Sequence, residues 1–283
     1  MNPTWKWISY LLPLFAVAVL VTGCSDDDDG TDPGPAGNVI SMDLRAGDDF
    51  IYDKWTLDEN NNKVGQPTTV EVEYKNSTGS TGGFSDYVKV EETDVATNTE
   101  TNYLIRTDNN GNLYRYAFVY DQLDLFISLL RDNVDPTINP SLGSRQWDLI
   151  AKFQDDAGNA LSSGATFNVA GTTIEDIKFG VNVQGFDIPV TVRPEITGYY
   201  EGSSETMEVQ GTTVNMWKCR IQLTMKIFSS IYTGDVVTNL IVWYSDNPDG
   251  RIKMIFESTT VSIPGFDDYT QFGEQFELKA FVN

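Results

Sequence analysis

The chain has 283 residues, enough for one large β-rich domain or two small ones, and a formal net charge of −22. This charge repels nucleic-acid phosphates, so we expect no binding to DNA or RNA. The chain contains no histidine. That absence excludes histidine-based acid–base and nucleophilic catalysis and removes the commonest zinc ligand.

The first 23 residues are predicted to be a cleavable export signal. Lys6 precedes an apolar run over residues 11–21, which is shorter than the roughly 20 residues of a spanning helix and suits a secretory signal. The run ends in Val21-Thr22-Gly23-Cys24, which resembles the lipobox of bacterial lipoproteins. The resemblance implies cleavage before Cys24 and a diacylglycerol on its thiol, so that the chain is held at a membrane by this lipid.

An acidic run follows the cysteine directly. It comprises Ser25, Asp26, Asp27, Asp28 and Asp29, and it resembles the surface-export signal of lipoproteins in the Bacteroidota. The resemblance implies a lipid-anchored protein of the outer membrane, exposed at the cell surface; the alternative is a solvated acidic linker. Residues 24–37 as a whole, rich in Asp, Pro and Gly, are predicted to be a flexible tether.

Alternation of apolar and polar residues dominates the chain from residue 38 to residue 283. The clearest run has apolar residues at Trp217, Cys219, Ile221, Leu223, Met225 and Ile227. Such alternation is typical of strands with one face in the core and one in solvent, which favours antiparallel pairing. The fold predicted is mainly β: an antiparallel, strongly curved sheet, or a barrel-like or sandwich domain.

One segment departs from this pattern. Apolar residues at helical spacing predict one short helix near 121–131, with Asp121 as its cap and residues 132–136 at its end. The polar loop at 133–144 is the one plausible internal boundary. We favour a single domain over residues 38–283 because no second tether-like linker is present.

Polar turns separate the predicted strands. Residues 108–111 end in Asn-Gly, which readily adopts positive φ angles, and residues 155–159 and 246–250 are further turns. Segment 58–63 has oxygen-bearing side chains but places Lys63 where a calcium-binding loop needs glycine. We therefore interpret it as a polar hairpin loop.

Candidate site residues are few. Cys219 lies on an apolar strand face and is interpreted as a core residue, and we expect no catalytic residue, metal site or cofactor beyond the lipid on Cys24. Four aromatic residues are candidate ligand contacts: Trp243, Tyr244, Tyr199 and Tyr200. Neighbouring residues of a strand point to opposite faces, so one ring of each pair can be exposed. Trp147 and Trp217 are expected to face inward.

These features predict a non-enzymatic envelope lipoprotein. Long amphipathic strands and one helix loosely resemble the half-barrel lipoprotein carriers and the lipocalin-like lipoproteins, which implies binding or carriage of an apolar ligand such as a lipid. The first alternative is a surface glycan-binding or adhesin-like accessory lipoprotein, in which exposed aromatic rings would stack on sugars. The second is a purely structural lipoprotein.

Overall fold

The computed structural model describes residues 40, 42–133, 135–170, 174–183, 185–230, 232–261 and 269–282. The predicted signal, lipobox, acidic run and tether lie outside the described residues. Within the described ranges, no helix has both the length and the hydropathy needed to cross a membrane.

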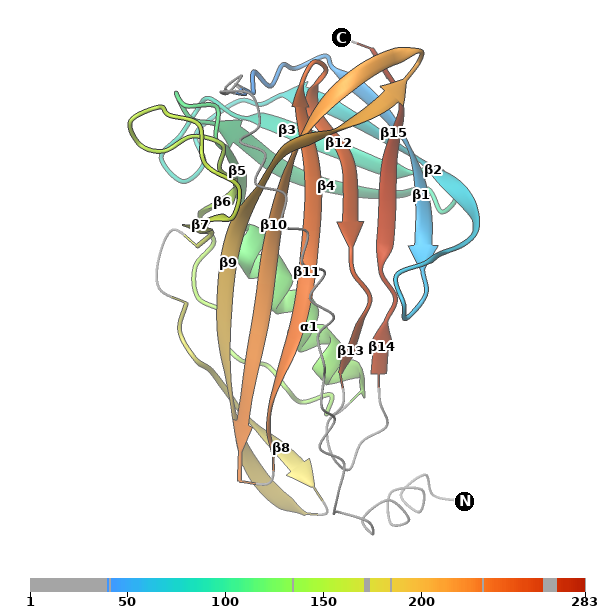
Figure 1. Cartoon of the computed structure of the whole chain (residues 1–283). Helices are drawn as coiled ribbons and strands as arrows, with labels where there is room; N and C mark the ends of the chain where they lie inside the picture. The colour runs from blue at the N-terminus through green and yellow to red at the C-terminus, as the bar shows by residue number, and fades with distance from the viewer. Residues whose placement is uncertain are drawn as a thin grey trace.

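One antiparallel sheet of 13 strands accounts for most of the described chain (Figure 1). Its spatial order is β6-β5-β4-β3-β2-β1-β15-β12-β11-β10-β9-β7, with β8 paired to β9, and β13 and β14 form a separate pair. The strands are β1 (Asp49–Leu57), β2 (Lys63–Asn76), β3 (Val88–Asp94), β4 (Thr99–Thr107), β5 (Leu113–Tyr116), β6 (Trp147–Ala151), β7 (Ala165–Asn168), β8 (Ile177–Val183), β9 (Phe186–Val209), β10 (Thr212–Ser229), β11 (Thr233–Asp246), β12 (Asp249–Phe256), β13 (Thr259–Val261), β14 (Tyr269–Gln271) and β15 (Glu274–Val282). The sheet therefore consists of an early meander, β1 to β6, and a late meander, β9 to β12, and β15 joins the two by pairing with β1 and β12.

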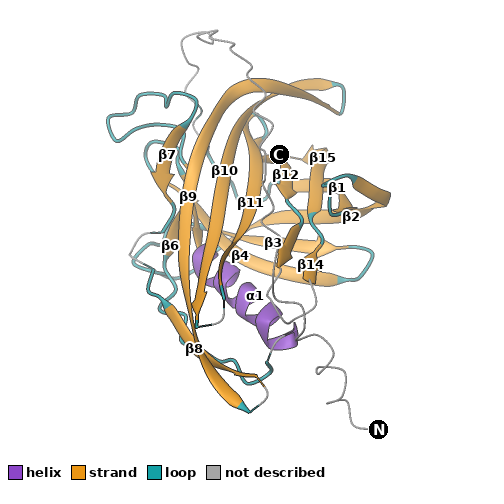
Figure 2. Ribbon diagram, turned by 60° about the horizontal axis from the view of Figure 1, so that its bottom comes forward, coloured by secondary structure: helices purple, strands orange, loops and turns teal. Residues whose placement is uncertain are grey.

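The sheet is strongly curved and open, which confirms the predicted fold class in its curved-sheet form. Its edges, β6 and β7, do not pair as strands. One backbone hydrogen bond, from Leu149 N–H to the carbonyl of Val169 at 2.8 Å, links β6 to the segment after β7. Figure 2 shows the curved sheet with α1 (Phe118–Asn133) beside its strands.

The predicted helix is confirmed, and it begins three residues before the predicted start. Its buried face packs against β10 residues that include Ile221 and Met225. The buried helix residues are Phe118, Val119, Leu123, Phe126, Ile127 and Leu130. The predicted cap is wrong: Asp148 of β6 accepts a hydrogen bond from Val119 N–H at 2.8 Å, whereas Asp121 in the first turn pairs with Arg115 at 3.2 Å. A carboxylate distant in sequence thus accepts a hydrogen bond from a backbone N–H at the start of the helix, which has no partner within the helix.

The loop at 133–144 does not interrupt the sheet. β5 precedes this loop and the helix, β6 follows it, and the two strands pair with each other through residues such as Tyr116 and Trp147. The same sheet therefore runs on both sides of this segment.

Three loops stabilise themselves with an aspartate at their first position. Asp58, Asp108 and Asp155 each accept backbone N–H hydrogen bonds, at 2.8–2.9 Å, from the residues two and four positions further on. In each loop the later residue is an asparagine whose amide donates back to the same carboxylate. The hydrogen bonds from Asn62 lower the pKa of Asp58, and those from Asn159 lower the pKa of Asp155.

The alternation predicted for residues 217–227 corresponds to burial in β10. Cys219 is 1% exposed in the core, and burial raises the pKa of its thiol. Trp217 is buried in the same cluster. Trp147 is also buried, but beneath the β2–β3 connection, where its indole N–H donates to the carbonyl of Thr81 at 2.9 Å and its ring contacts Tyr87.

A largely buried ion pair crosses the inside of the curved sheet. Arg251 of β12 lies 3.2 Å from Glu92 of β3, although three strands separate β12 from β3 in the sheet order. Tyr103 donates to the same carboxylate at 3.4 Å, and Tyr52 donates to the Arg251 carbonyl at 2.6 Å. Burial, together with the charge of Glu92, raises the pKa of Tyr103 to about 12. The sheet's curvature brings these distant strands together.

Candidate functional site

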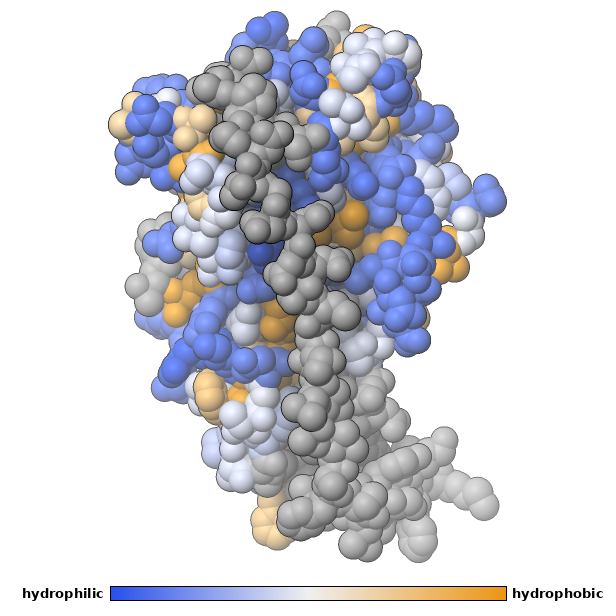
Figure 3. Space-filling model, in the orientation of Figure 1, coloured by the Kyte–Doolittle hydropathy of each residue, from blue (hydrophilic) through white to orange (hydrophobic). Residues whose placement is uncertain are grey.

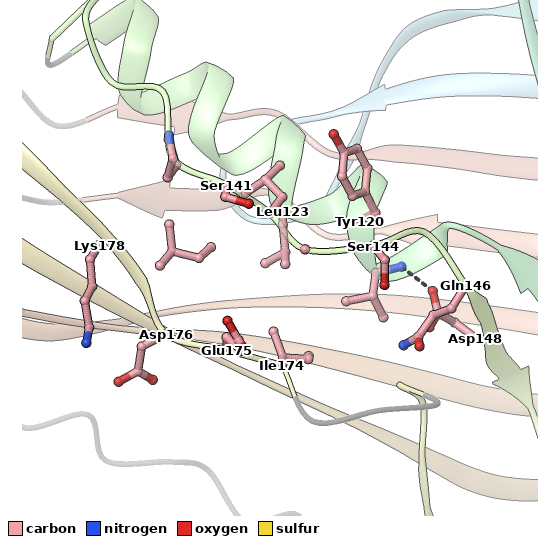
Figure 4. A pocket seen from close by; sticks show the side chains of 15 residues that line it. Tyr120, Leu123, Ser141, Ser144, Gln146, Asp148, Ile174, Glu175, Asp176 and Lys178 are labelled. Carbon is pink, nitrogen blue, oxygen red and sulfur yellow. Dashed lines mark hydrogen bonds between the residues drawn. The ribbon is translucent and has the colours of Figure 1, made fainter.

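A cavity of about 660 Å³ lies beside the start of α1 (Figure 4). Four segments line this helix-side cavity: the first turns of α1, the loop at 140–146, the start of β6 at Asp148, and the entry to β8 at 174–178. The buried helix residues that do not line the cavity pack on the sheet. The first turns of α1 form one wall of the cavity, and the segments at 140–146 and 174–178 form the walls beside it.

The walls of the helix-side cavity combine apolar and polar side chains. Leu123 and Ile174 lie on opposite sides of it (Figure 4), and buried Ile177 extends the apolar part. Hydroxyl and amide groups of Ser141, Ser144, Tyr120 and Gln146 complete the lining. This mixture of surfaces suits a ligand with both an apolar part and hydrogen-bonding groups.

Asp148 occupies the inner wall of the cavity and is fully buried. One carboxylate oxygen accepts from Val119 N–H at 2.8 Å and the other accepts from the Gln146 amide at 3.3 Å. Both oxygens are therefore engaged in holding the helix start against β6. Asp148 thereby shapes the inner wall of the cavity.

The outer wall carries further charge. Arg193 donates two hydrogen bonds to Asp176, both at 3.0 Å, and thereby lowers the pKa of that carboxyl group. Glu175 and Lys178 are exposed beside it. The cavity lining contains three carboxylate side chains, those of Asp148, Glu175 and Asp176, and one lysine. The cavity therefore disfavours anions and is compatible with neutral or cationic ligands.

The predicted aromatic residues do not form an exposed patch. Trp243 and Tyr244 are each 4% exposed and Tyr200 is 6% exposed. Tyr199 is half-buried, with the Arg220 guanidinium 4.0 Å from its ring centre. The expectation that one ring of the Trp243–Tyr244 pair is open to solvent is therefore wrong.

The reason lies in what covers the two strand faces. On one face, the ammonium groups of Lys218 and Lys253 lie 5.2 Å and 4.8 Å from the Trp243 ring centre. On the other, Tyr244 packs edge-to-face against Phe153 at 5.8 Å. In the view of Figure 3 the coloured surface is largely hydrophilic, and its hydrophobic areas are small. Ligand contact by these four residues remains a prediction, and none of them lines the helix-side cavity.

The residues of the helix-side cavity were not identified from sequence. Their one sequence signal is the polar, proline- and glycine-containing loop that includes Pro140 and Gly143 directly after a helix. Cys24 and the acidic run, by contrast, are identified from sequence alone and lie outside the described residues.

Comparison with known proteins identifies no family. No protein-family model matches the chain, and no curated protein matches it. Among solved structures, the chain is similar to one described as a "putative lipoprotein" from Parabacteroides distasonis, with 9% sequence identity and a TM-score of 0.39. The similarity covers 85% of this chain and 97% of that one. A likeness at this score supports no argument about the fold or the function of the present chain.

Proposed function

We propose that this chain is a lipid-anchored envelope protein whose β domain binds a small amphiphilic molecule, neutral or cationic, in the helix-side cavity. The cavity itself carries the proposal: its volume of about 660 Å³ lies within the range of roughly 300–1,000 Å³ typical of small-molecule sites. The lipobox-like Val21-Thr22-Gly23-Cys24 supports the anchor. The domain needs no catalytic group for this role.

The position of the cavity changes the carrier hypothesis. A half-barrel carrier holds its ligand against the concave face of its sheet, but the cavity described there measures only about 70 Å³. A lipid chain does not fit into that volume. The helix-side cavity has the necessary size, and its apolar side chains accept the apolar part of a ligand while its polar ones meet the head group.

Binding is tested with N-phenyl-1-naphthylamine, a neutral dye whose fluorescence rises in apolar surroundings. We expect saturable binding at one site, and Ser144→Trp to weaken it at least tenfold because the indole fills the cavity. The control is Ser162→Trp, which adds the same ring at an exposed position away from the cavity. Absence of saturable binding, or equal affinity in the two variants with circular dichroism unchanged, would rule out the site.

Surface exposure is tested by protease treatment of intact cells. We expect the native chain to be cleaved and a version with alanine at positions 26–29 to be protected, because the acidic run resembles a surface-export signal. The control places the same four aspartates after residue 37, which keeps the charge but moves it away from Cys24. Cleavage of the alanine version to the native extent would show that the run is a solvated linker.

A further inference from the structure

Two tyrosine hydroxyl groups inside the curved sheet lack hydrogen-bond partners among the described residues. Tyr74 is 5% exposed and Tyr244 is 4% exposed. Their neighbours Tyr52 and Tyr103 both donate hydrogen bonds, to the Arg251 carbonyl and to Glu92. Neither hydroxyl oxygen is among the fully buried polar atoms that lack a partner in the described residues, so both are open to the space beside them and available to a ligand.

Both hydroxyl-bearing residues line one cavity of about 70 Å³ on the concave side of the sheet. A single water needs roughly 15 Å³ by a comparable measure, so the space accommodates a small organic molecule. This interior cavity shares no lining residue with the helix-side cavity. It is therefore a separate candidate site.

Two guanidinium groups also line the interior cavity. Arg251 pairs with Glu92, and Arg115 pairs with Asp121, each at 3.2 Å. The Nε of Arg115 is buried and has no hydrogen-bond partner within the described part of the chain. The side chain of Arg115 is 22% exposed, and that of Arg251 is 13% exposed, so both retain some contact with solvent.

The unpaired groups are hydrogen-bond donors. Burial raises the pKa values of Tyr74 and Tyr244, so both hydroxyls keep their protons at neutral pH. Burial disfavours the charge on Arg251, but Glu92 and the surrounding tyrosines together outweigh this effect, and the pKa of Arg251 lies well above its usual range. The two O–H groups can thus donate to an acceptor placed in the cavity.

The rest of the cavity wall is apolar. It includes Leu44, Leu113, Ile150, Ile221 and Leu240. Such walls disfavour inorganic phosphate or sulfate, whose oxygens all need hydrogen bonds, and they favour an anion with a short hydrocarbon part.

We infer that the interior cavity binds a small aliphatic carboxylate. The tyrosine hydroxyls donate to the carboxylate oxygens, the guanidinium groups of Arg115 and Arg251 supply positive charge in the cavity wall, and the hydrocarbon part packs against the leucine and isoleucine walls. The cavity volume limits the chain to a few carbons. The inference does not depend on the proposed ligand of the helix-side cavity.

The test uses the mature chain with Cys24→Ala and ¹³C-labelled butyrate as the probe, followed by NMR titration. We expect saturable binding of butyrate and at least tenfold weaker binding of butyramide, which has the same shape without the charge. Tyr74→Phe and Tyr244→Phe should each weaken butyrate binding at least fivefold. These variants should fold normally, because they remove hydroxyls that have no partner among the described residues.

Tyr52→Phe is the matched control, since its hydroxyl is bonded to the Arg251 carbonyl and Tyr52 does not line the cavity. It should leave butyrate affinity within twofold of the native value. Butyrate should also raise the Tm of the native chain more than that of Tyr244→Phe. Unsaturable binding, equal binding of butyramide, or unchanged affinity in both cavity variants would overturn the inference and indicate that the cavity holds water.

Discussion

We expect Cys24→Ala to abolish incorporation of labelled palmitate into this protein. The lipobox-like sequence contains one thiol that can accept the diacylglycerol, and the second cysteine, Cys219, is buried in the core. Each buried CH₂ of an acyl chain contributes about 0.8 kcal/mol to membrane binding, so two or more chains hold the protein firmly. The measurement is metabolic labelling followed by immunoprecipitation.

The matching fractionation experiment replaces residues 1–24 with a cleavable signal that is not lipidated. We expect the domain to move from the membrane pellet to the soluble fraction. Ser25→Ala, next to the modified position, is the control and should keep both the label and the pellet location. Retention of label in Cys24→Ala would place the lipid elsewhere in the chain.

Glu92→Ala destabilises the domain by about 3 kcal/mol, because it leaves Arg251 without its ion-pair partner in a largely buried position. The same substitution removes the acceptor of the Tyr103 hydroxyl. In thermal unfolding we expect Tm to fall by roughly 6–12 °C. The measurement is calorimetry or circular dichroism at neutral pH.

Glu91→Ala is the control, because Glu91 points to the strand face opposite to that of Glu92 and pairs with Lys89 near solvent. We expect it to cost less than about 1 kcal/mol. Adding Arg251→Met to Glu92→Ala should recover part of the lost stability by removing the unpaired charge. Equal effects of the two glutamate substitutions would show that the buried pair does not hold the two sides of the sheet together.

The sequence predicts local features of this fold well. Alternation identifies β10 because side chains of a strand point alternately to its two faces. Helical spacing identifies α1 for the same local reason. The Asn110-Gly111 turn between β4 and β5 is likewise set by its own residues.

Features that depend on contacts between distant parts of the chain cannot be predicted from local sequence patterns. Asp148 caps α1 from β6, so the cap is absent from the helix's own sequence. Trp243 is buried by lysines of two neighbouring strands, which parity along β11 does not reveal. Glu92 shares the inward face of β3 with Val90 and meets Arg251 only through curvature of the sheet. The cavities depend on these same long-range contacts.

The place of β15 has a consequence for the timing of assembly. This strand joins β1 on one side and β12 on the other, with Asp49 opposite Val282, and the ribosome makes it after both of those neighbours. Until it emerges, the early and late meanders each keep an unpaired edge strand. The nascent polypeptide therefore cannot complete this sheet before β15 is synthesised, so the two meanders can join only after translation has passed residue 282.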